Sequence, residues 1–186
     1  MLLYKKLDVP NFETMRLELA TATLPKVMLG TRFWDEAPSW FETNTPTLYN
    51  FIERNKKLSI RLFRFYLTPP NDILIPHVDG LTTNRSPLGL NIPITGYQNT
   101  TMDWYDNPAD NFKDGNYGFN NITASRIIDF NKLTKIESTV IDCPTFVRTD
   151  VVHGVVNNNP TPRLVLSIRF VYSKVAGQQF NEVFNF

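Results

Sequence analysis

The stretch that decides the fold is RLVLSIRFVY, residues 163–172, near the end of the 186-residue chain. Aliphatic, β-branched and aromatic residues follow one another here, which predicts a β-strand. Successive side chains of a strand point to opposite faces of its sheet. One face of this strand is apolar apart from a tyrosine hydroxyl and carries Leu164, Leu166, Ile168, Phe170 and Tyr172. The opposite face carries Arg163, Val165, Ser167, Arg169 and Val171.

These two faces predict two different surroundings. The apolar face needs a hydrophobic cover, and we expect two N-terminal helices to provide it. Apolar residues recur at helical spacing from Asn11, a predicted cap, to about Ala22, and Thr45-Pro46 is typical of a helix start that continues to about Lys57. The other face carries two arginines and a serine on a predicted central strand, so we expect it to line a polar cavity.

Strands predominate after residue 57, where apolar runs alternate with Pro, Gly, Asn and Asp. The predicted strands are 58–67, 73–78, 88–94, 101–105, 126–130, 134–141, 145–148, 152–156 and 163–172. About seven to nine short strands without helical periods between them favour an antiparallel sandwich or barrel. Residues 107–121, NPADNFKDGNYGFNN, are predicted to form a long exposed loop inside this region.

Length and composition predict one globular domain, 1–186, with a helical flank 1–57, a β core 58–172 and a tail 173–186. The net charge of +1 and the lack of a long basic block disfavour nucleic acid as the main partner. Cys143 is the only cysteine, so neither an internal disulfide nor a cysteine-based zinc site is expected. With no predicted signal peptide or membrane span, we expect a cytoplasmic, reducing location.

Three potential metal ligands lie in two of the predicted strands. His77 and Asp79 follow an apolar run in IPHVDG, and a spacing of two residues places both side chains on the same face. His153, the second of only two histidines, lies in DVVHGVVN, which we expect to pair near the first strand. Two imidazoles and one carboxylate form the ligand set that holds non-haem Fe(II) on one side and leaves open positions. Arg163 follows ten residues after His153 and can bind a carboxylate through two hydrogen bonds.

This order of residues resembles the Fe(II)/2-oxoglutarate-dependent dioxygenases, in particular their aspartyl/asparaginyl hydroxylase-like and prolyl hydroxylase-like branches. The resemblance covers about residues 60–172 and includes GLNIPI, residues 89–94, after the first motif. It implies a mainly β fold: a double-stranded β-helix, that is a jelly-roll or cupin-like barrel, with flanking N-terminal α-helices. It also implies that O2 and 2-oxoglutarate react at Fe(II), that succinate and CO2 are released, and that an unidentified small molecule or peptide is hydroxylated.

The resemblance assigns a role to each site residue. His77, Asp79 and His153 are implied to be the iron ligands and the catalytic centre, and Arg163 is implied to bind the far carboxylate of 2-oxoglutarate. Many members of the family carry Ser or Thr two residues after the arginine, where this chain has Val165. Ser167, one step further along the same face, is the expected substitute. Asn91 in GLNIPI is either a cofactor contact or a buried amide satisfied by backbone groups.

Other interpretations of these residues remain open at this stage. His77 and Asp79 are also compatible with a simple turn before Gly80. A non-oxidative cupin-like module that binds a metal or another ligand, or a scaffold that has kept only the barrel, would fit the same strands. Trp104 and Tyr105 favour packing over substrate stacking. Substrate identity and oligomeric state are not indicated by the sequence, although the predicted loops 82–87 and 107–121 would shape the pocket.

Overall fold

The computed structural model describes residues 2–30, 32–54, 60–79, 85–108, 111–116, 123–127 and 129–171. Three α-helices are found in these residues: α1 (Phe12–Met28), α2 (Pro38–Asn44) and α3 (Pro46–Arg54). The strands are β1 (Tyr4–Lys6), β2 (Phe33–Glu36), β3 (Ile60–Thr68), β4 (Asp72–Asp79), β5 (Arg85–Thr95), β6 (Thr100–Asp106), β7 (Phe112–Asn116), β8 (Thr123–Ile127), β9 (Thr134–Val140), β10 (Thr145–Arg148), β11 (Val152–Asn157) and β12 (Arg163–Val171). A short 3-10 helix, η2, spans Phe130–Lys132.

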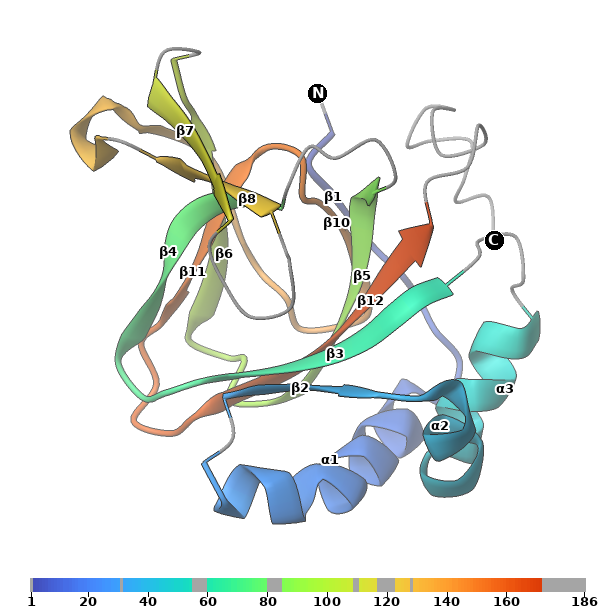
Figure 1. The fold of residues 1–186 in the computed structure, drawn as a ribbon. Helices are drawn as coiled ribbons and strands as arrows, with labels where there is room; N and C mark the ends of the chain where they lie inside the picture. Colours follow the sequence, from blue (N-terminus) through green and yellow to red (C-terminus); the bar gives the residue numbers. More distant parts are fainter. Residues whose placement is uncertain are drawn as a thin grey trace.

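Two antiparallel sheets of six strands each build the molecule (Figure 1). The first has the order β1-β10-β5-β12-β3-β2 and is called the helix-backed sheet here. The second has the order β7-β8-β4-β11-β6-β9 and is called the opposite sheet. From β3 to β6 the chain changes sheet at every strand, and it does so again from β9 to β12. This alternation is the double-stranded β-helix, or jelly roll, that the sequence predicts.

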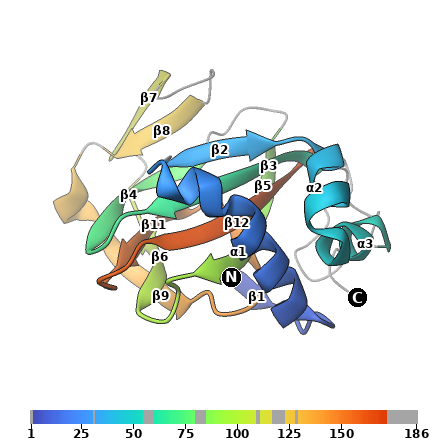
Figure 2. The same ribbon diagram turned by 90° about the horizontal axis from the view of Figure 1, so that it is seen from below.

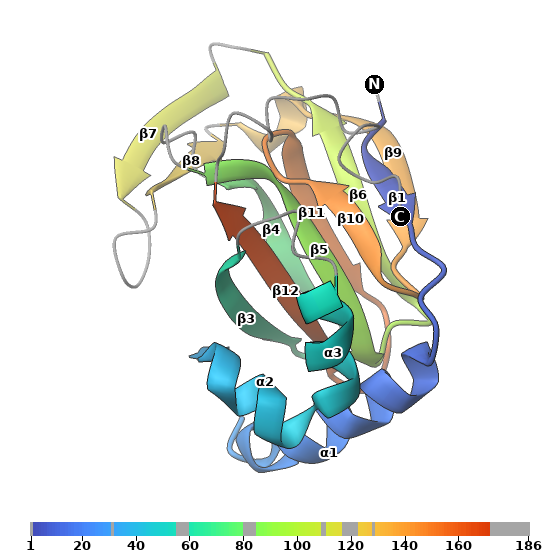
Figure 3. The same cartoon turned by 90° about the vertical axis from the view of Figure 1, so that its right-hand side faces the viewer.

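The helices cover one face of the helix-backed sheet only. Seen from below, α1 lies across the strands of this sheet, and α2 and α3 lie beside it (Figure 2). Seen from the right, all three helices are on the side of the sheet that faces away from β4, β6 and β11 (Figure 3). The other face of the helix-backed sheet is therefore turned toward the opposite sheet.

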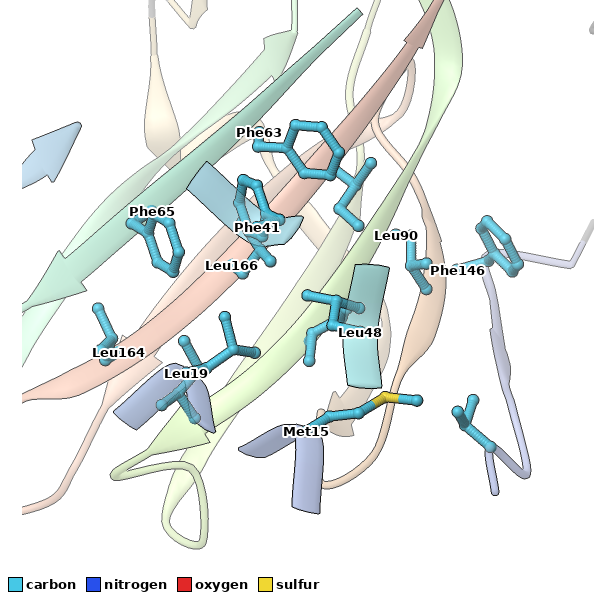
Figure 4. Close-up of a cluster of buried hydrophobic side chains, with 14 of the residues drawn as sticks. Met15, Leu19, Phe41, Leu48, Phe63, Phe65, Leu90, Phe146, Leu164 and Leu166 are labelled. Atoms are coloured by element: carbon cyan, nitrogen blue, oxygen red, sulfur yellow. The ribbon is translucent and has the colours of Figure 1, made fainter. Parts of the chain in front are cut away.

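The main hydrophobic core lies between the helices and this sheet. Leu19 of α1 lies near Leu164 and Leu166 of β12, Phe41 of α2 lies beside Leu166, and Met15 of α1 belongs to the same cluster (Figure 4). All five side chains are almost completely buried. The apolar face of β12 is thus covered by the N-terminal helices, as predicted from its alternation. Full burial of an aliphatic or aromatic side chain contributes about 1.5–3 kcal/mol, so this layer holds β12 firmly in its register.

Helix α1 is also tied to α3 by a polar contact at the start of α3. The backbone N–H of Thr47 donates to Glu18 Oε2 at 3.1 Å, and the Thr47 hydroxyl donates to Glu18 Oε1 at 2.7 Å. The first N–H groups of a helix have no partner within the helix, so the Glu18 carboxylate gives one of them a hydrogen-bond acceptor. Its negative charge is also attracted by the positive end of the α3 dipole. The sequence prediction assigned the start of this helix to Thr45-Pro46, and α3 begins at Pro46.

Several predicted boundaries are wrong. The first helix continues to Met28, past Pro25, and α2 was not expected. The region predicted as flank also contributes β1, which pairs with β10, and β2, which pairs with β3. Residues 112–116, predicted as loop, form β7 against β8, and the strand predicted at 126–130 is instead β8, which ends at Ile127. Residues 80–84, 109–110, 117–122 and 172–186 lie outside the described part of the chain, so part of both predicted loops lies there too.

Among the described residues, no helix has the length and apolar character needed to cross a lipid bilayer.

Candidate metal centre

The three predicted ligands lie side by side on two neighbouring strands of the opposite sheet. His77 of β4 is the register partner of His153 of β11, and their ring centroids are 4.6 Å apart. Asp79 lies two residues after His77 on the same face, and its Oδ1 is 3.5 Å from His77 Nε2. One ligand atom from each of the three residues lies within 4.8 Å of the other two. The structure therefore brings together the complete set of residues predicted from the sequence.

Both histidines are oriented by their own backbone. His77 Nδ1 lies 2.8 Å from the carbonyl oxygen of Ile75, and His153 Nδ1 lies 2.8 Å from that of Val151. A carbonyl oxygen can only accept, so each Nδ1 carries the proton and each Nε2 has a free lone pair. A metal-binding histidine is usually held in its tautomer by such a hydrogen bond on the other ring nitrogen. Both Nε2 atoms are thus prepared for a cation.

Burial and neighbouring charges set the protonation of the triad. Burial lowers the pKa of His153 to about 4, with a further lowering by His77, so this imidazole is neutral at pH 7. Burial would raise the pKa of Asp79, but the charge of Arg169, with smaller contributions from the two histidines, brings it well below its usual range. Burial also opposes the charged form of His77, yet in that form the ring is 3.5 Å from the Asp79 carboxylate, which leaves the pKa of His77 above its ordinary value. A neutral imidazole and an ionised carboxylate are the forms that bind metals.

A cavity of about 270 Å³ lies between the two sheets, next to the triad. Both histidines line it, together with all four residues of the polar face of β12 from Arg163 to Arg169. The prediction that this face lines a polar cavity is therefore confirmed. The lining is mixed, because apolar side chains such as Leu74, Met102 and Val155 contribute to it as well. A concave, largely apolar space with a few polar groups is the usual form of a small-molecule site.

Arg163 is the most unusual residue of this cavity. Only 4% of its surface is exposed, and in the described part of the chain its guanidinium has neither a hydrogen bond nor an ion pair. Burial lowers its pKa to about 10, and no acid offsets this effect. An arginine with such a pKa still carries its charge at pH 7. A buried and unpaired cation costs several kcal/mol, so its position in a cavity indicates a site for an anion.

Ser167 and Asn91 lie together in the same cavity. They are register partners on β12 and β5, and both are buried. Among the described residues, neither the Ser167 hydroxyl oxygen nor Asn91 Oδ1 has a hydrogen-bond partner, and the one hydrogen bond of the Asn91 amide nitrogen is with the sulfur of Met102 at 3.9 Å. In this part of the chain no backbone group satisfies Asn91, which favours the alternative of a cofactor contact. Unpartnered buried polar atoms in a cavity are typical of groups that await a ligand.

One contact of the triad was not predicted from the sequence. Arg169 Nη1 of β12 lies 2.6 Å from Asp79 Oδ2, and this ion pair connects the helix-backed sheet to the opposite sheet. The alternation of β12 already places Arg169 on the cavity face, which was the available signal. Its partner could not be identified, because the approach of β12 and β4 is a property of the whole fold.

The remaining predicted residues fall outside the cavity. Trp104 is fully buried, stacks on Tyr4 with ring centroids 5.6 Å apart, and donates to the backbone oxygen of Arg148. Tyr105 packs partly buried against a small apolar cluster. Both are packing residues, as predicted. Arg64, whose position could not be derived from the sequence, forms a two-bond ion pair with Asp35 of β2.

Comparisons with known proteins agree with the fold. No protein-family model and no curated protein matches this sequence. Similar solved structures include the non-heme alpha ketoglutarate dependent carbocyclase SnoK from nogalamycin biosynthesis, with a TM-score of 0.56, 10% identity, and coverage of 90% of this chain and 79% of SnoK. The epimerase SnoN, solved with Fe3+, alpha ketoglutarate and nogalamycin RO, has a TM-score of 0.54 and 14% identity, over 90% of this chain and 78% of SnoN.

A third similar structure is the viral collagen prolyl hydroxylase vCPH of Paramecium Bursaria Chlorella virus-1, in its 2OG complex. It has a TM-score of 0.51 and 12% identity, over 92% of this chain and 97% of that one. At such low identity the likeness establishes the shared fold, the double-stranded β-helix. The chemistry of the present chain has to be argued from its own residues.

Proposed function

We propose that the chain is an Fe(II)- and 2-oxoglutarate-dependent oxygenase, with residues 1–186 forming one catalytic domain. His77, Asp79 and His153 bind the iron in this proposal, and Arg163 binds the far carboxylate of 2-oxoglutarate. The observation that carries the proposal is the buried and unpaired Arg163 guanidinium in the same cavity as the triad. A metal site alone fits many functions, whereas a metal site with an anion site beside it fits a cosubstrate that is both a chelator and a dicarboxylate.

The triad fits Fe(II) by its donor set. Two neutral imidazoles and one ionised carboxylate on one side of an ion leave the opposite side open, as in the non-haem Fe(II) oxygenases. A structural zinc site would instead use four protein ligands. Among the described residues, the cluster contains only these three.

The cavity fits a dicarboxylate by its charges. Arg163 offers up to five N–H donors in a planar arrangement that matches a carboxylate. Ser167 and Asn91, whose buried oxygens have no partner, lie on the same inner face and can orient the bound acid through hydrogen bonds. The amide nitrogen of Asn91 and the hydroxyl of Ser167 are both donors. These residues hold the cosubstrate at the end that does not react.

When bound, the iron and 2-oxoglutarate supply the oxidative chemistry, in which O2 is consumed and succinate and CO2 are released. The residues of the chain bind, orient and exclude water. His77 and His153 keep their Nδ1 protons on backbone carbonyls, so their orientation does not change when a ligand binds. The apolar side chains that line the cavity exclude water from the reacting centre, which strengthens every charge interaction there.

Similar structures support this proposal and suggest its outcome. SnoK is described as alpha ketoglutarate dependent, and SnoN and vCPH were solved with that cosubstrate. We propose hydroxylation of a small molecule or peptide as the reaction of this chain, without nucleic acid or a membrane as partner. We also propose the cytoplasm as its location, because a single half-buried cysteine is compatible with a reducing compartment.

The test is an anaerobic titration of the iron-loaded chain with 2-oxoglutarate. Chelation of Fe(II) by a 2-oxo acid produces a metal-to-ligand charge-transfer band in the visible spectrum, which we expect to saturate at one equivalent. His153→Ala is the control that should lose both iron and band. If the wild-type chain binds iron but shows no band, the oxygenase proposal fails and a non-oxidative metal-binding module becomes the better interpretation.

A further inference from the structure

We propose that Arg169 is a positioning residue, seated on Gly89, that holds the Asp79 carboxylate and leaves one of its two oxygens for the metal. This inference rests on the proposed function, because it assigns how one of the three iron ligands is presented. It concerns Arg169 and Gly89, neither of which is part of the iron-ligand set or the carboxylate anchor.

The two oxygens of Asp79 have different partners. Oδ2 lies 2.6 Å from Arg169 Nη1, a short charge-assisted contact, whereas Oδ1 lies 3.5 Å from Nε2 of His77. Oδ2 is thus engaged by the arginine, and Oδ1 faces the nitrogen atoms that we assign to the metal. A carboxylate held through one oxygen cannot rotate freely, so its orientation is fixed before a metal binds.

Gly89 makes the position of the guanidinium possible. It is the register partner of Arg169 in the adjacent strand β5. A Cβ atom at residue 89 would lie 2.9 Å from Arg169 Nη1 and 3.4 Å from Cζ. The guanidinium group therefore lies directly over the glycine backbone, and a side chain at residue 89 would force it to shift from the position in which it contacts Asp79. Glycine is required at residue 89 because the guanidinium occupies the space of a side chain, and not because of the backbone conformation there.

The charge of Arg169 is compensated on both sides. Burial lowers its pKa, but the charge of Asp79, with a smaller contribution from Tyr66 of β3, leaves the pKa above the ordinary value. About a fifth of the Arg169 side chain remains exposed. The guanidinium is therefore paired with Asp79 of β4 and lies over Gly89 of β5. This contrasts with Arg163 on the same face, which has no partner in the described residues and is the cation left for a ligand.

The one-oxygen arrangement matters for the proposed chemistry. An octahedral ion bound by two imidazoles and one carboxylate oxygen keeps about three free positions. In the proposed function these positions would serve a chelating 2-oxo acid and O2. If Asp79 bound through both oxygens, one of these positions would be lost. In this proposal Arg169 therefore prevents Asp79 from occupying a second position on the metal.

The experiment measures Mn(II) binding, because Mn(II) is stable in air and accepts the same ligands as Fe(II). Free Mn(II) is followed by its electron paramagnetic resonance signal during titration of the wild-type chain, Arg169→Met, Arg169→Lys and Gly89→Ala. Removal of a side chain that orients a metal ligand typically weakens metal binding about 10-fold to 100-fold. We expect this loss in Arg169→Met, a loss in the same direction in Gly89→Ala, and partial recovery in Arg169→Lys, whose ammonium can reach one oxygen. Arg16→Met, which breaks a 2.6 Å ion pair with Glu13 on α1, is the matched control and should bind like wild type.

A second measurement separates positioning from a general loss of structure. Water proton relaxation counts the water molecules on bound Mn(II), about three in the wild-type chain and fewer in Arg169→Met, where both Asp79 oxygens become available. Equal or tighter Mn(II) binding in folded Arg169→Met and Gly89→Ala would overturn the positioning role, and an unchanged water count would overturn the one-oxygen arrangement. A wild-type chain that binds no Mn(II), or that binds Mn(II) but not 2-oxoglutarate, contradicts the proposed function instead.

Discussion

Replacing Arg163 by methionine should have opposite effects on stability and on ligand binding. Arg163 is 4% exposed and has no partner among the described residues, so in the absence of a ligand its charge destabilises the fold. Methionine has a similar length, no charge, and a shape that suits an irregular cavity. Exchange of a buried charged group for an apolar one of similar volume is often neutral or stabilising by about 1–4 kcal/mol. We therefore expect an equal or higher melting temperature for Arg163→Met.

Binding of 2-oxoglutarate should be weakened by the same substitution. A desolvated, charge-assisted pair between a guanidinium and a carboxylate is worth about 2–5 kcal/mol when one partner is removed. Since about 1.4 kcal/mol corresponds to a factor of ten, the dissociation constant should rise by roughly 30-fold to several thousandfold. Metal binding should be unchanged, because Arg163 contacts none of the three ligands.

Calorimetry on the Mn(II)-loaded chain measures both quantities in one preparation, with thermal unfolding of the metal-free chain beside it. Arg16→Met is again the control, since it removes an arginine that does not line the cavity. Two results would refute the reasoning. If 2-oxoglutarate binds equally to wild type and Arg163→Met, the anion site is not at Arg163. If Arg163→Met unfolds at a much lower temperature, the guanidinium has a stabilising partner and its burial does not indicate a ligand.

Three further outcomes follow from the structure. His153→Ala should abolish stoichiometric Mn(II) binding while the chain stays folded, and retained stoichiometric binding would exclude His153 as a ligand. Burial raises the pKa of Asp103, but hydrogen bonds from Lys135 and Ser138 lower it below the ordinary value, so the stabilisation by the ionised carboxylate is present above about pH 4 and is lost as the pH falls further. Asp103→Asn should therefore lower the free energy of unfolding at pH 7 by about 1–3 kcal/mol and should lose less stability in acid than wild type. Urea unfolding at pH 7 and in acid can check both expectations. Cys143→Ala should turn over 2-oxoglutarate at a near wild-type rate, because its thiol does not line the cavity and burial raises its pKa; a hundredfold loss would contradict this.

The sequence predicted those parts of the fold that depend on one strand at a time. The alternation of residues 163–172 was sufficient to assign one face to the helices and the other to the cavity, because side chains of a strand have a period of two. His77 and His153 were expected to lie near each other because each is in a predicted strand and the two strands could pair; the register of β4 and β11 places them opposite each other. Arg163 was found through its spacing from His153.

Features that depend on contacts between distant segments could not be predicted. Strand β1 has three residues and exists only because β10 offers a free edge, and β2 pairs with the other end of the same sheet. The stretch 112–116 is rich in polar residues and Gly and predicts a loop by composition, yet backbone pairing with β8 makes it a strand. Tertiary context overrides local preference in such short strands.

Helix α1 illustrates the opposite error. The apolar residues at helical spacing predict an end near Ala22, and Pro25 disfavours a helical conformation at the residue before it. The helix nevertheless continues to Met28. Thr23 helps to hold this turn, because its buried hydroxyl donates to the carbonyl of Leu19 at 2.7 Å. Leu29 N–H then bonds back to Pro25, so the last turn is completed by backbone hydrogen bonds. A proline near a helix end is thus compatible with one more helical turn after it, provided that backbone hydrogen bonds of the following residues can form.

The spacing of the two cavity arginines explains how one strand can serve both halves of the site. Arg163 and Arg169 are six residues apart on β12, which corresponds to about 20 Å along a strand. They share a face because six is an even number and side chains alternate along a strand. Arg169 lies over Gly89 and contacts Asp79. Arg163 lies beside Thr68, at the end of β3 where the chain turns into β4. Ser167 lies between them, opposite Asn91, and the buried oxygens of both have no hydrogen-bond partner in the part of the chain that the structure describes. A dicarboxylate that chelates at the triad and extends toward Arg163 would pass these two residues. The same strand therefore supports the metal ligand at one end and holds the far carboxylate at the other.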